Sequence, residues 1–272
     1  MPSDFEAGTF QTSDRCEIAF SLHPAPVASA GRIVLIHSLA LDQTIWDGVV
    51  ARLAGAAEVL TYDCRGHGRS QRQASSFTSE LFARDLAELL DHAGWQSAAL
   101  AGCSMGGCVA QAFAGLYPSR AKALGLIDTT AWYGPHGPAE WLERAATARL
   151  KGFGAMADFQ VRRWFSDKFR AERLELANAA VRVFLANDVD CYASACTLLG
   201  EADLRHYLPS LHLPVTIIVG EEDNATPVSE SRLLHEAIAG SKLHILPKAR
   251  HLTPIECPDA ISSELLGLLR RV

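Results

Sequence analysis

The chain has 272 residues, of which 49% are hydrophobic and 21% are charged, and its formal net charge is −6. This is the composition of an ordinary globular protein, and the length suits one large α/β unit. The acidic balance argues against a nucleic-acid partner, because proteins that follow phosphate backbones usually carry a basic excess.

Short β-rich apolar runs alternate with helical patterns along most of the chain. An antiparallel hairpin is expected over residues 9–22, at the edge of a sheet. Six runs read as strands, most of them buried on both faces: residues 32–38, 57–63, 98–103, 121–128, 214–220 and 242–246. Helices are expected over residues 79–92, 105–117, 231–239 and 259–269. This alternation predicts a mostly parallel sheet covered by helices on both faces.

One long segment departs from the alternation. Residues 132–209 contain helical patterns but no convincing strand, and their first residues are rich in Pro and Gly, as in a hinge. We therefore expect a helical cap at 132–209, inserted into an α/β core formed by residues 1–131 and 210–272.

The sequence Gly-Cys-Ser-Met-Gly at residues 102–106 follows an apolar strand and opens a helix. In that context Gly-x-Ser-x-Gly is the signature of a nucleophile elbow, whose tight turn needs small flanking residues. Ser104 is the predicted nucleophile, and the backbone N–H of Met105 is a predicted oxyanion donor. Cys103 is a rival nucleophile, but its place on the strand side of the turn predicts that it packs inside.

A serine hydroxyl needs a base and an orienting acid, which in this fold follow the serine in the order acid, then histidine. His251 comes after the last predicted strand and is the predicted base. Asp223 lies in a Gly-x-x-Asp-x-x-x-Pro turn after the preceding strand and is the predicted acid. Asp128, at the end of another strand, is the alternative acid.

The loop after the first core strand usually supplies the second oxyanion donor. We assign this role to the backbone N–H of Leu39 and expect Ser38, in the same loop, beside the substrate. The polar, Gly-rich turn at residues 63–70 matches neither the Walker A nor the dinucleotide-binding spacing, and it is interpreted as structural.

With these segments in hand, the chain resembles 3-oxoadipate enol-lactonases of the α/β-hydrolase superfamily from about Ile33 to the C-terminus. The more specific similarities are residues 163–165, 190–196 and 201–205, whereas the chain departs from the family pattern at residues 36–38, 103, 128 and 251–254. The resemblance implies an α/β-hydrolase fold and lactone or ester hydrolysis through an acyl-enzyme, as in the degradation of aromatic compounds. It implies no metal and no organic cofactor.

The charge of the expected cap bears on the substrate. Residues 140–182 contain nine Lys or Arg and six Asp or Glu, although the whole chain is acidic. A substrate that carries a carboxylate would suit such a lid, with Arg162 or Arg163 holding it. A solvated helix face would account for the same charges. Trp132 and Trp164 are candidates for the pocket wall.

Other functions fit the same residues. The triad also serves carbon–carbon bond hydrolases, simple carboxylesterases and perhydrolases, and a ligand receptor could use the same scaffold. The complete Ser, His and Asp set favours an enzyme with a small-molecule substrate.

No signal peptide or membrane span is visible, and seven cysteines without a Cys-x-x-Cys pair predict reduced thiols, so a cytoplasmic protein is expected. Homo-oligomer formation is compatible with the sequence.

Overall fold

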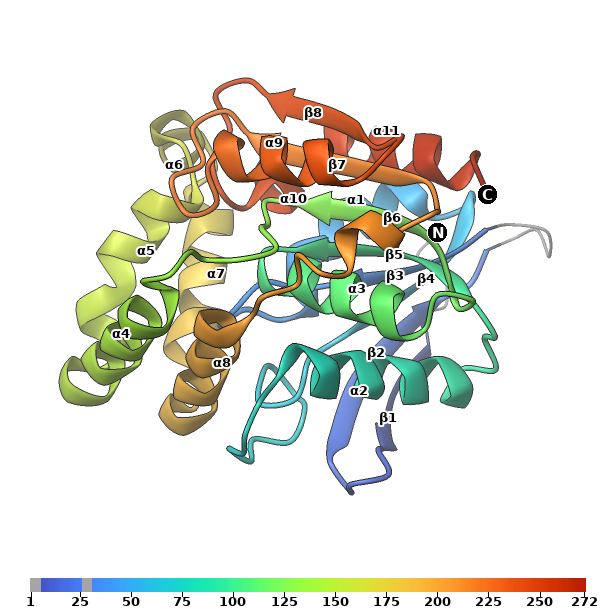
Figure 1. Cartoon of the computed structure of the whole chain (residues 1–272). Coiled ribbons are helices and arrows are strands. Elements are labelled where there is room, and N and C mark those ends of the chain that lie inside the picture. Colours follow the sequence, from blue (N-terminus) through green and yellow to red (C-terminus); the bar gives the residue numbers. More distant parts are fainter. Residues whose placement is uncertain (1–5, 26–30) are drawn as a thin grey trace.

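The computed structural model describes residues 6–25 and 31–272. An eight-stranded sheet has the order β1-β2-β4-β3-β5-β6-β7-β8 (Figure 1). Strands β3 to β8 are parallel, while β1 and β2 form an antiparallel hairpin at one edge. The strands are β1 (Glu6–Gln11), β2 (Glu17–His23), β3 (Gly31–Ile36), β4 (Ala57–Tyr62), β5 (Ala98–Cys103), β6 (Ala121–Ile127), β7 (Val215–Gly220) and β8 (Lys242–Leu246).

Helices cover both faces of the sheet. On one face α1 packs against α11, which lies on β6 and β7; on the other α2 packs against α3, which lies on β3, β5 and β6, and α9 covers β7 and β8. These helices and short turns are η1 (Gln43–Trp46), α1 (Asp47–Leu53), α2 (Ser79–His92), α3 (Met105–Leu116), η3 (Leu208–Ser210), α9 (Val228–Ala237), α10 (Thr253–Glu256) and α11 (Pro258–Leu269). Strands β5 and β7 are buried along their whole length, as strands covered on both faces must be.

Residues 132–209, here called the helical insertion, connect β6 to β7. They form α4 (Gly137–Lys151), η2 (Phe153–Met156), α5 (Ala157–Trp164), α6 (Asp167–Glu172), α7 (Leu174–Leu185) and α8 (Val189–Glu201), followed by η3. An isolated bridge between Trp132 and Asp203 joins the two ends of the insertion. Figure 1 shows its helices on the side toward which the parallel strands point, where side chains at the carboxyl ends of the strands meet.

The predicted α/β fold with a mostly parallel sheet is confirmed. The boundary differences reach three residues: β1 begins at Glu6 rather than at residue 9, and α9 begins at Val228, directly after Pro227, rather than at residue 231. The sequence also gave no sign of α1 or α10, which have only 7 and 4 residues and too few turns for a clear amphipathic period.

A buried ion pair lies in the turn at residues 63–70, in line with the structural role predicted for it. The Arg65 guanidinium donates to Asp85 in α2 at 2.5 and 2.6 Å, and to Asp14 in the β1–β2 turn at 3.0 and 3.1 Å. Only 6% of the Arg65 side chain is exposed, and the two carboxylates offset its loss of hydration. The cluster fixes the edge hairpin to the core.

Candidate active site

Ser104 lies at the turn between β5 and α3 with φ 55° and ψ −114°, a conformation that a residue with a side chain rarely adopts. The turn needs glycine on both sides. A Cβ on Gly102 would lie 2.0 Å from the Gly106 carbonyl oxygen, and a Cβ on Gly106 would lie 2.2 Å from that of Ile36. The two glycines thus allow β3, β5 and α3 to approach closely enough to present the serine hydroxyl.

The predicted nucleophile, base and acid lie in one chain of hydrogen bonds. The distance from His251 Nε2 to Ser104 Oγ is 3.0 Å, and that from His251 Nδ1 to Asp223 Oδ2 is 2.8 Å. Both histidine and aspartate come from loops at the carboxyl ends of strands, after β8 and β7. All three residues are buried, each with about 5% of its surface exposed.

The surroundings of Asp223 favour its ionised form. Its carboxylate accepts hydrogen bonds from the N–H groups of Ala225 and Thr226, at 2.7 and 3.0 Å, and from the Thr226 hydroxyl at 3.0 Å. Burial opposes ionisation, but the neighbouring His251 and these hydrogen bonds outweigh it and lower the pKa of Asp223. An ionised Asp223 holds the proton of His251 on Nδ1, which leaves Nε2 free to accept the proton of Ser104.

The alternative acid, Asp128, is bound elsewhere. Its carboxylate accepts hydrogen bonds from the N–H of Gly220 at 3.1 Å and from the N–H and hydroxyl of Thr253 at 3.0 and 2.7 Å. Burial, together with the charge of Asp223, raises the pKa of Asp128. It joins the ends of β6 and β7 to the start of α10, and Asp223 rather than Asp128 is bonded to His251.

The rival nucleophile is also turned away from the serine hydroxyl. Cys103 is fully buried, and its thiol points at the backbone oxygen of His251, 4.0 Å away. Burial raises the pKa of this thiol well above its ordinary value, so it stays protonated at neutral pH.

The loop after β3 is positioned for an oxyanion donor. His37 is fully buried; its Nδ1 donates to the Ser38 carbonyl at 2.7 Å, and its Nε2 accepts the Cys64 N–H at 2.8 Å. Because the peptide bond is trans, a carbonyl held in this way directs the N–H of Leu39 to the opposite side. Ser38 and Leu39 both line the cavity at Ser104, and Met105 is the first residue of α3.

Two adjoining cavities lead from the catalytic residues to the surface of the insertion. The inner one, about 30 Å³, lies at Ser104 and His251 and is large enough for about one water molecule. The outer one, about 440 Å³, is large enough for a small substrate. They share the side chains of Tyr133, Trp141, Arg144, Arg163 and Ala225.

Of the substrate-binding residues predicted in the insertion, Arg163 and Trp164 line the inner cavity. Trp132 does not, which corrects the prediction: its ring stacks under the Arg205 guanidinium, 3.7 Å away, at a separate cavity. Arg162 is also outside, where it forms an exposed ion pair with Asp158 at 3.0 Å. Neighbouring residues of a helix point about 100° apart, and in α5 this rotation directs Arg162 away from the cavity that Arg163 faces.

Four further residues that line the inner cavity were not predicted from the sequence: Trp141 and Arg144 in α4, Gln160 in α5, and Tyr133 before α4. The available signal was helical spacing, because Trp141 and Arg144 are three residues apart and so lie on one face of their helix. Helix α5 presents Gln160, Arg163 and Trp164 to the same cavity at the same helical spacing.

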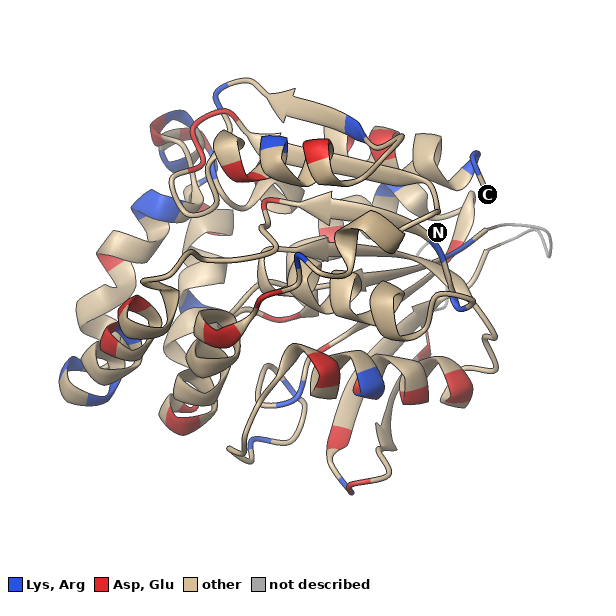
Figure 2. Ribbon diagram, viewed as in Figure 1, with Lys and Arg blue, Asp and Glu red and all other residues tan. Residues whose placement is uncertain are grey.

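The two arginines give the inner cavity a positive wall, whereas the outer cavity is also lined by Glu140 and Glu143. Arg144 donates to the Tyr192 hydroxyl at 2.9 Å and lies over the Trp141 ring. Burial, together with the charge of Arg144, lowers the pKa of Arg163. Within residues 6–25 and 31–272, no carboxylate forms an ion pair with either guanidinium. Figure 2 shows further basic residues on α4, α5 and α6.

Neither a metal-binding cluster nor a membrane-spanning helix is found in the described part of the chain. Its His, Cys, Asp and Glu side chains form no group of three or more that could hold a metal ion. None of its helices combines the length and the apolar character needed to cross a bilayer.

Comparison with known proteins defines the class. The sequence model of the alpha/beta hydrolase fold family matches residues 31–258, so the chain belongs to this family, and the prediction of a hydrolytic enzyme is confirmed.

Among its relatives, the chain is 30% identical to 3-oxoadipate enol-lactonase 2 of Acinetobacter baylyi, over 92% of this chain and 94% of the relative. It also resembles the crystal structure of the enol-lactonase from Burkholderia xenovorans LB400, with a TM-score of 0.92 and 32% identity over 97% and 100% of the two chains. A thermophilic esterase from Thermogutta terrifontis, described as malate-bound, gives a TM-score of 0.90 and 29% identity over 97% and 98%.

Proposed function

We propose that the protein is a serine hydrolase that opens a lactone or ester bond of a small carboxylate-bearing substrate. The observation that carries this proposal is the continuous hydrogen-bonded chain from Asp223 through His251 to Ser104 at a strained turn. A binding protein would have no need of a serine held in this way.

In the proposed mechanism, His251 Nε2 takes the proton of Ser104 as Oγ attacks the substrate carbonyl carbon. The resulting oxyanion lies between the N–H groups of Leu39 and Met105. When this intermediate collapses, the C=O bond re-forms, the bond between the former carbonyl carbon and the leaving oxygen breaks, and His251 gives the proton to the leaving oxygen. Water, deprotonated by His251, then attacks the acyl-enzyme and releases the acid and Ser104. No metal or organic cofactor takes part in these steps.

The substrate class is inferred from the wall that the inner and outer cavities share, and we propose that the helical insertion is a cap that closes over them. Arg144 and Arg163 lie on the wall shared by the two cavities and would bind a carboxylate at the far end of a substrate whose carbonyl sits at Ser104. The relative from Acinetobacter baylyi is by name a 3-oxoadipate enol-lactonase, and we propose 3-oxoadipate enol-lactone as the substrate. Malate, named for the esterase structure, also carries carboxylates.

The test follows the opening of 3-oxoadipate enol-lactone by ultraviolet absorbance, beside a neutral aryl ester. Ser104→Ala should reduce kcat by roughly 10⁴-fold or more on both substrates. Ser263→Ala, the same change at an exposed position of α11, should leave kcat unaltered. Turnover that survives Ser104→Ala would refute the nucleophile. Serine-dependent cleavage of the ester without turnover of the lactone would refute the lactone and retain the triad.

A further inference from the structure

The loop that carries His251 is bound to the helical insertion directly beside the histidine. The N–H of Leu252 donates to the carbonyl oxygen of Trp164, at the end of α5, over 3.1 Å. The Trp164 side chain, only 3% exposed, lines the inner cavity together with His251. One short segment of the insertion therefore touches both the base loop and the substrate space.

Arg250, on the other side of the histidine, makes a second connection. Its Nη1 donates to the carbonyl oxygens of Arg162 and Phe165 at 2.8 and 3.1 Å, and lies 3.1 Å from a carboxylate oxygen of Asp167 at the start of α6. Its Nε lies 3.4 Å from the Glu222 carboxylate in the acid loop. A single guanidinium thus joins the α5–α6 junction to the loop that holds the acid.

Glu256 in α10 completes the connection. Its carboxylate accepts the N–H of Arg250 at 3.1 Å, the N–H of Ser166 at 3.3 Å, and the Ser166 hydroxyl. Ser166 is in turn the N-cap of α6, where its hydroxyl accepts the Phe169 N–H at 3.2 Å. The group Arg250, Glu256 and Ser166 is called the Arg250 cluster below.

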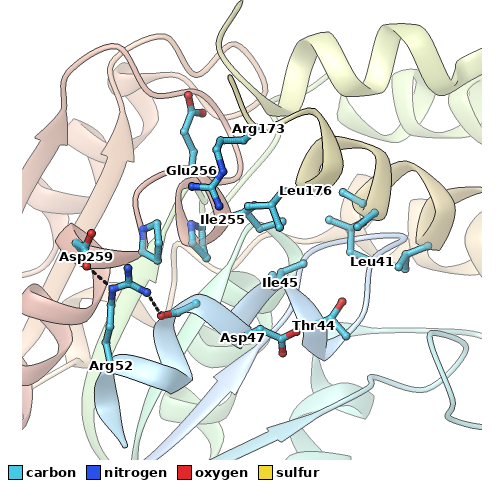
Figure 3. A pocket seen from close by; sticks show the side chains of 16 residues that line it. Leu41, Thr44, Ile45, Asp47, Arg52, Arg173, Leu176, Ile255, Glu256 and Asp259 are labelled. Carbon is cyan, nitrogen blue, oxygen red and sulfur yellow. Dashed lines mark hydrogen bonds and ion pairs between the residues drawn. The ribbon is translucent and has the colours of Figure 1, made fainter. Parts of the chain in front are cut away.

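Apolar packing is weak on the adjoining side of this contact. A cavity of about 430 Å³ separates α7 of the insertion from η1, α1 and α10 of the core, with Leu176 on one wall and Ile255 and Glu256 on the other (Figure 3). Contacts across such a space contribute little, because dispersion forces need atoms at van der Waals distance. The Arg250 cluster supplies polar contacts between the insertion and the core at the border of this cavity.

We propose that Arg250 is a positioning residue: by fixing the α5–α6 junction to the acid and base loops, it makes the seating of the insertion and the orientation of His251 a single event. Loss of the guanidinium would free the junction, displace Trp164 and loosen the loop on both sides of the histidine. The inference rests on the proposed triad. It assigns to residues outside the cavity a role in the chemical step.

A role in folding alone would lower stability but leave folded enzyme with normal kinetics, so the test measures the reactivity of the folded protein. Ser104 is labelled with an uncharged fluorophosphonate, whose reaction reports serine activation without substrate binding. The steady-state kcat and KM are measured on the aryl ester. The variants are Arg250→Met, which keeps the length of the side chain, Arg250→Lys, and the control Arg149→Met, which removes an exposed arginine paired with Asp190.

Arg250→Met should slow labelling by roughly ten- to hundredfold and lower kcat to a similar extent with little change in KM, because small displacements of catalytic groups have effects of this size. Arg250→Lys should recover part of the rate, since an ammonium can bind a carbonyl but cannot reproduce the planar fork. Arg149→Met should match the wild type.

Labelling and kcat within about twofold of the wild type in Arg250→Met would overturn the proposal, as would an equal loss in Arg149→Met. If Arg250→Met does not fold, Ser166→Ala removes one bond of the cluster and should slow labelling several-fold; an unchanged rate there also overturns it. Failure of the proposed function looks different, because the wild type would then not be labelled or Ser104→Ala would keep its activity.

Discussion

Arg163 offers the sharpest test of how the substrate is recognised. Its guanidinium faces the two adjoining cavities, and burial, together with the charge of Arg144, lowers its pKa, which means that its charge is held at a cost in the free enzyme. Arg163→Met removes the charge and keeps an unbranched side chain. The change should therefore weaken binding of a carboxylate and stabilise the fold at the same time.

The expected loss of kcat/KM comes from the bond between the guanidinium and the substrate, and the expected gain in stability comes from its desolvation in the free enzyme. A hydrogen bond between charged partners contributes about 1.5–3 kcal/mol, so kcat/KM for a carboxylate-bearing lactone should fall roughly 10- to 150-fold. A neutral aryl ester makes no such bond, and its kcat/KM should change less than about twofold. The charge is desolvated, lies over the Phe159 ring and pairs with no described carboxylate, so its removal should raise the free energy of unfolding by roughly 1 kcal/mol and Tm by roughly 2 °C.

The assay compares kcat/KM of the wild type, Arg163→Met and Arg162→Met on both substrates, with Tm from calorimetry. Arg162 is the matched control, because its side chain pairs with Asp158 outside the cavity. Equal losses on the lactone and the neutral ester would refute carboxylate recognition by Arg163. So would a lactone defect in Arg162→Met as large as that in Arg163→Met.

Three further outcomes are expected. Gly106→Ala should prevent soluble expression or abolish activity, because its Cβ would lie 2.2 Å from the Ile36 carbonyl oxygen; an active, stable variant would contradict the close approach of α3 to β3. Iodoacetamide at pH 7 should leave activity intact, since the buried Cys103 thiol stays protonated, and rapid inactivation with labelling of this residue would show otherwise. Hydrogen bonds from Arg65 lower the pKa of Asp14 from 3.8 to about 2, so its ionised form stabilises the fold above pH 3.8 and this contribution is lost as pH falls toward 2. The Asp14 side chain is half exposed, so Asp14→Asn should lower the free energy of unfolding by only about 1 kcal/mol at pH 6 and by less at pH 3. The measurement is urea unfolding at both pH values, and an equal loss at the two would refute the lowered pKa of Asp14.

The sequence alone determined the features that depend on local order along the chain. Alternating apolar runs and helical periods gave the parallel sheet, because each pattern suits one kind of backbone and one kind of burial. The glycines at 102 and 106 marked the turn at Ser104, since a side chain at either position would clash with backbone atoms. The positions of Asp223 and His251 after the last two predicted strands, in the order acid then histidine, then predicted their roles as acid and base.

Only the tertiary structure decided between residues that look alike in sequence. Asp128 and Asp223 follow adjacent parallel strands and are both buried, and their hydrogen-bond partners alone separate them. Arg162 and Arg163 are neighbours in α5, but the rotation of that helix against the core sends one into solvent and the other into the cavity. These outcomes depend on how segments distant in sequence pack together, and no local pattern of residues records that packing.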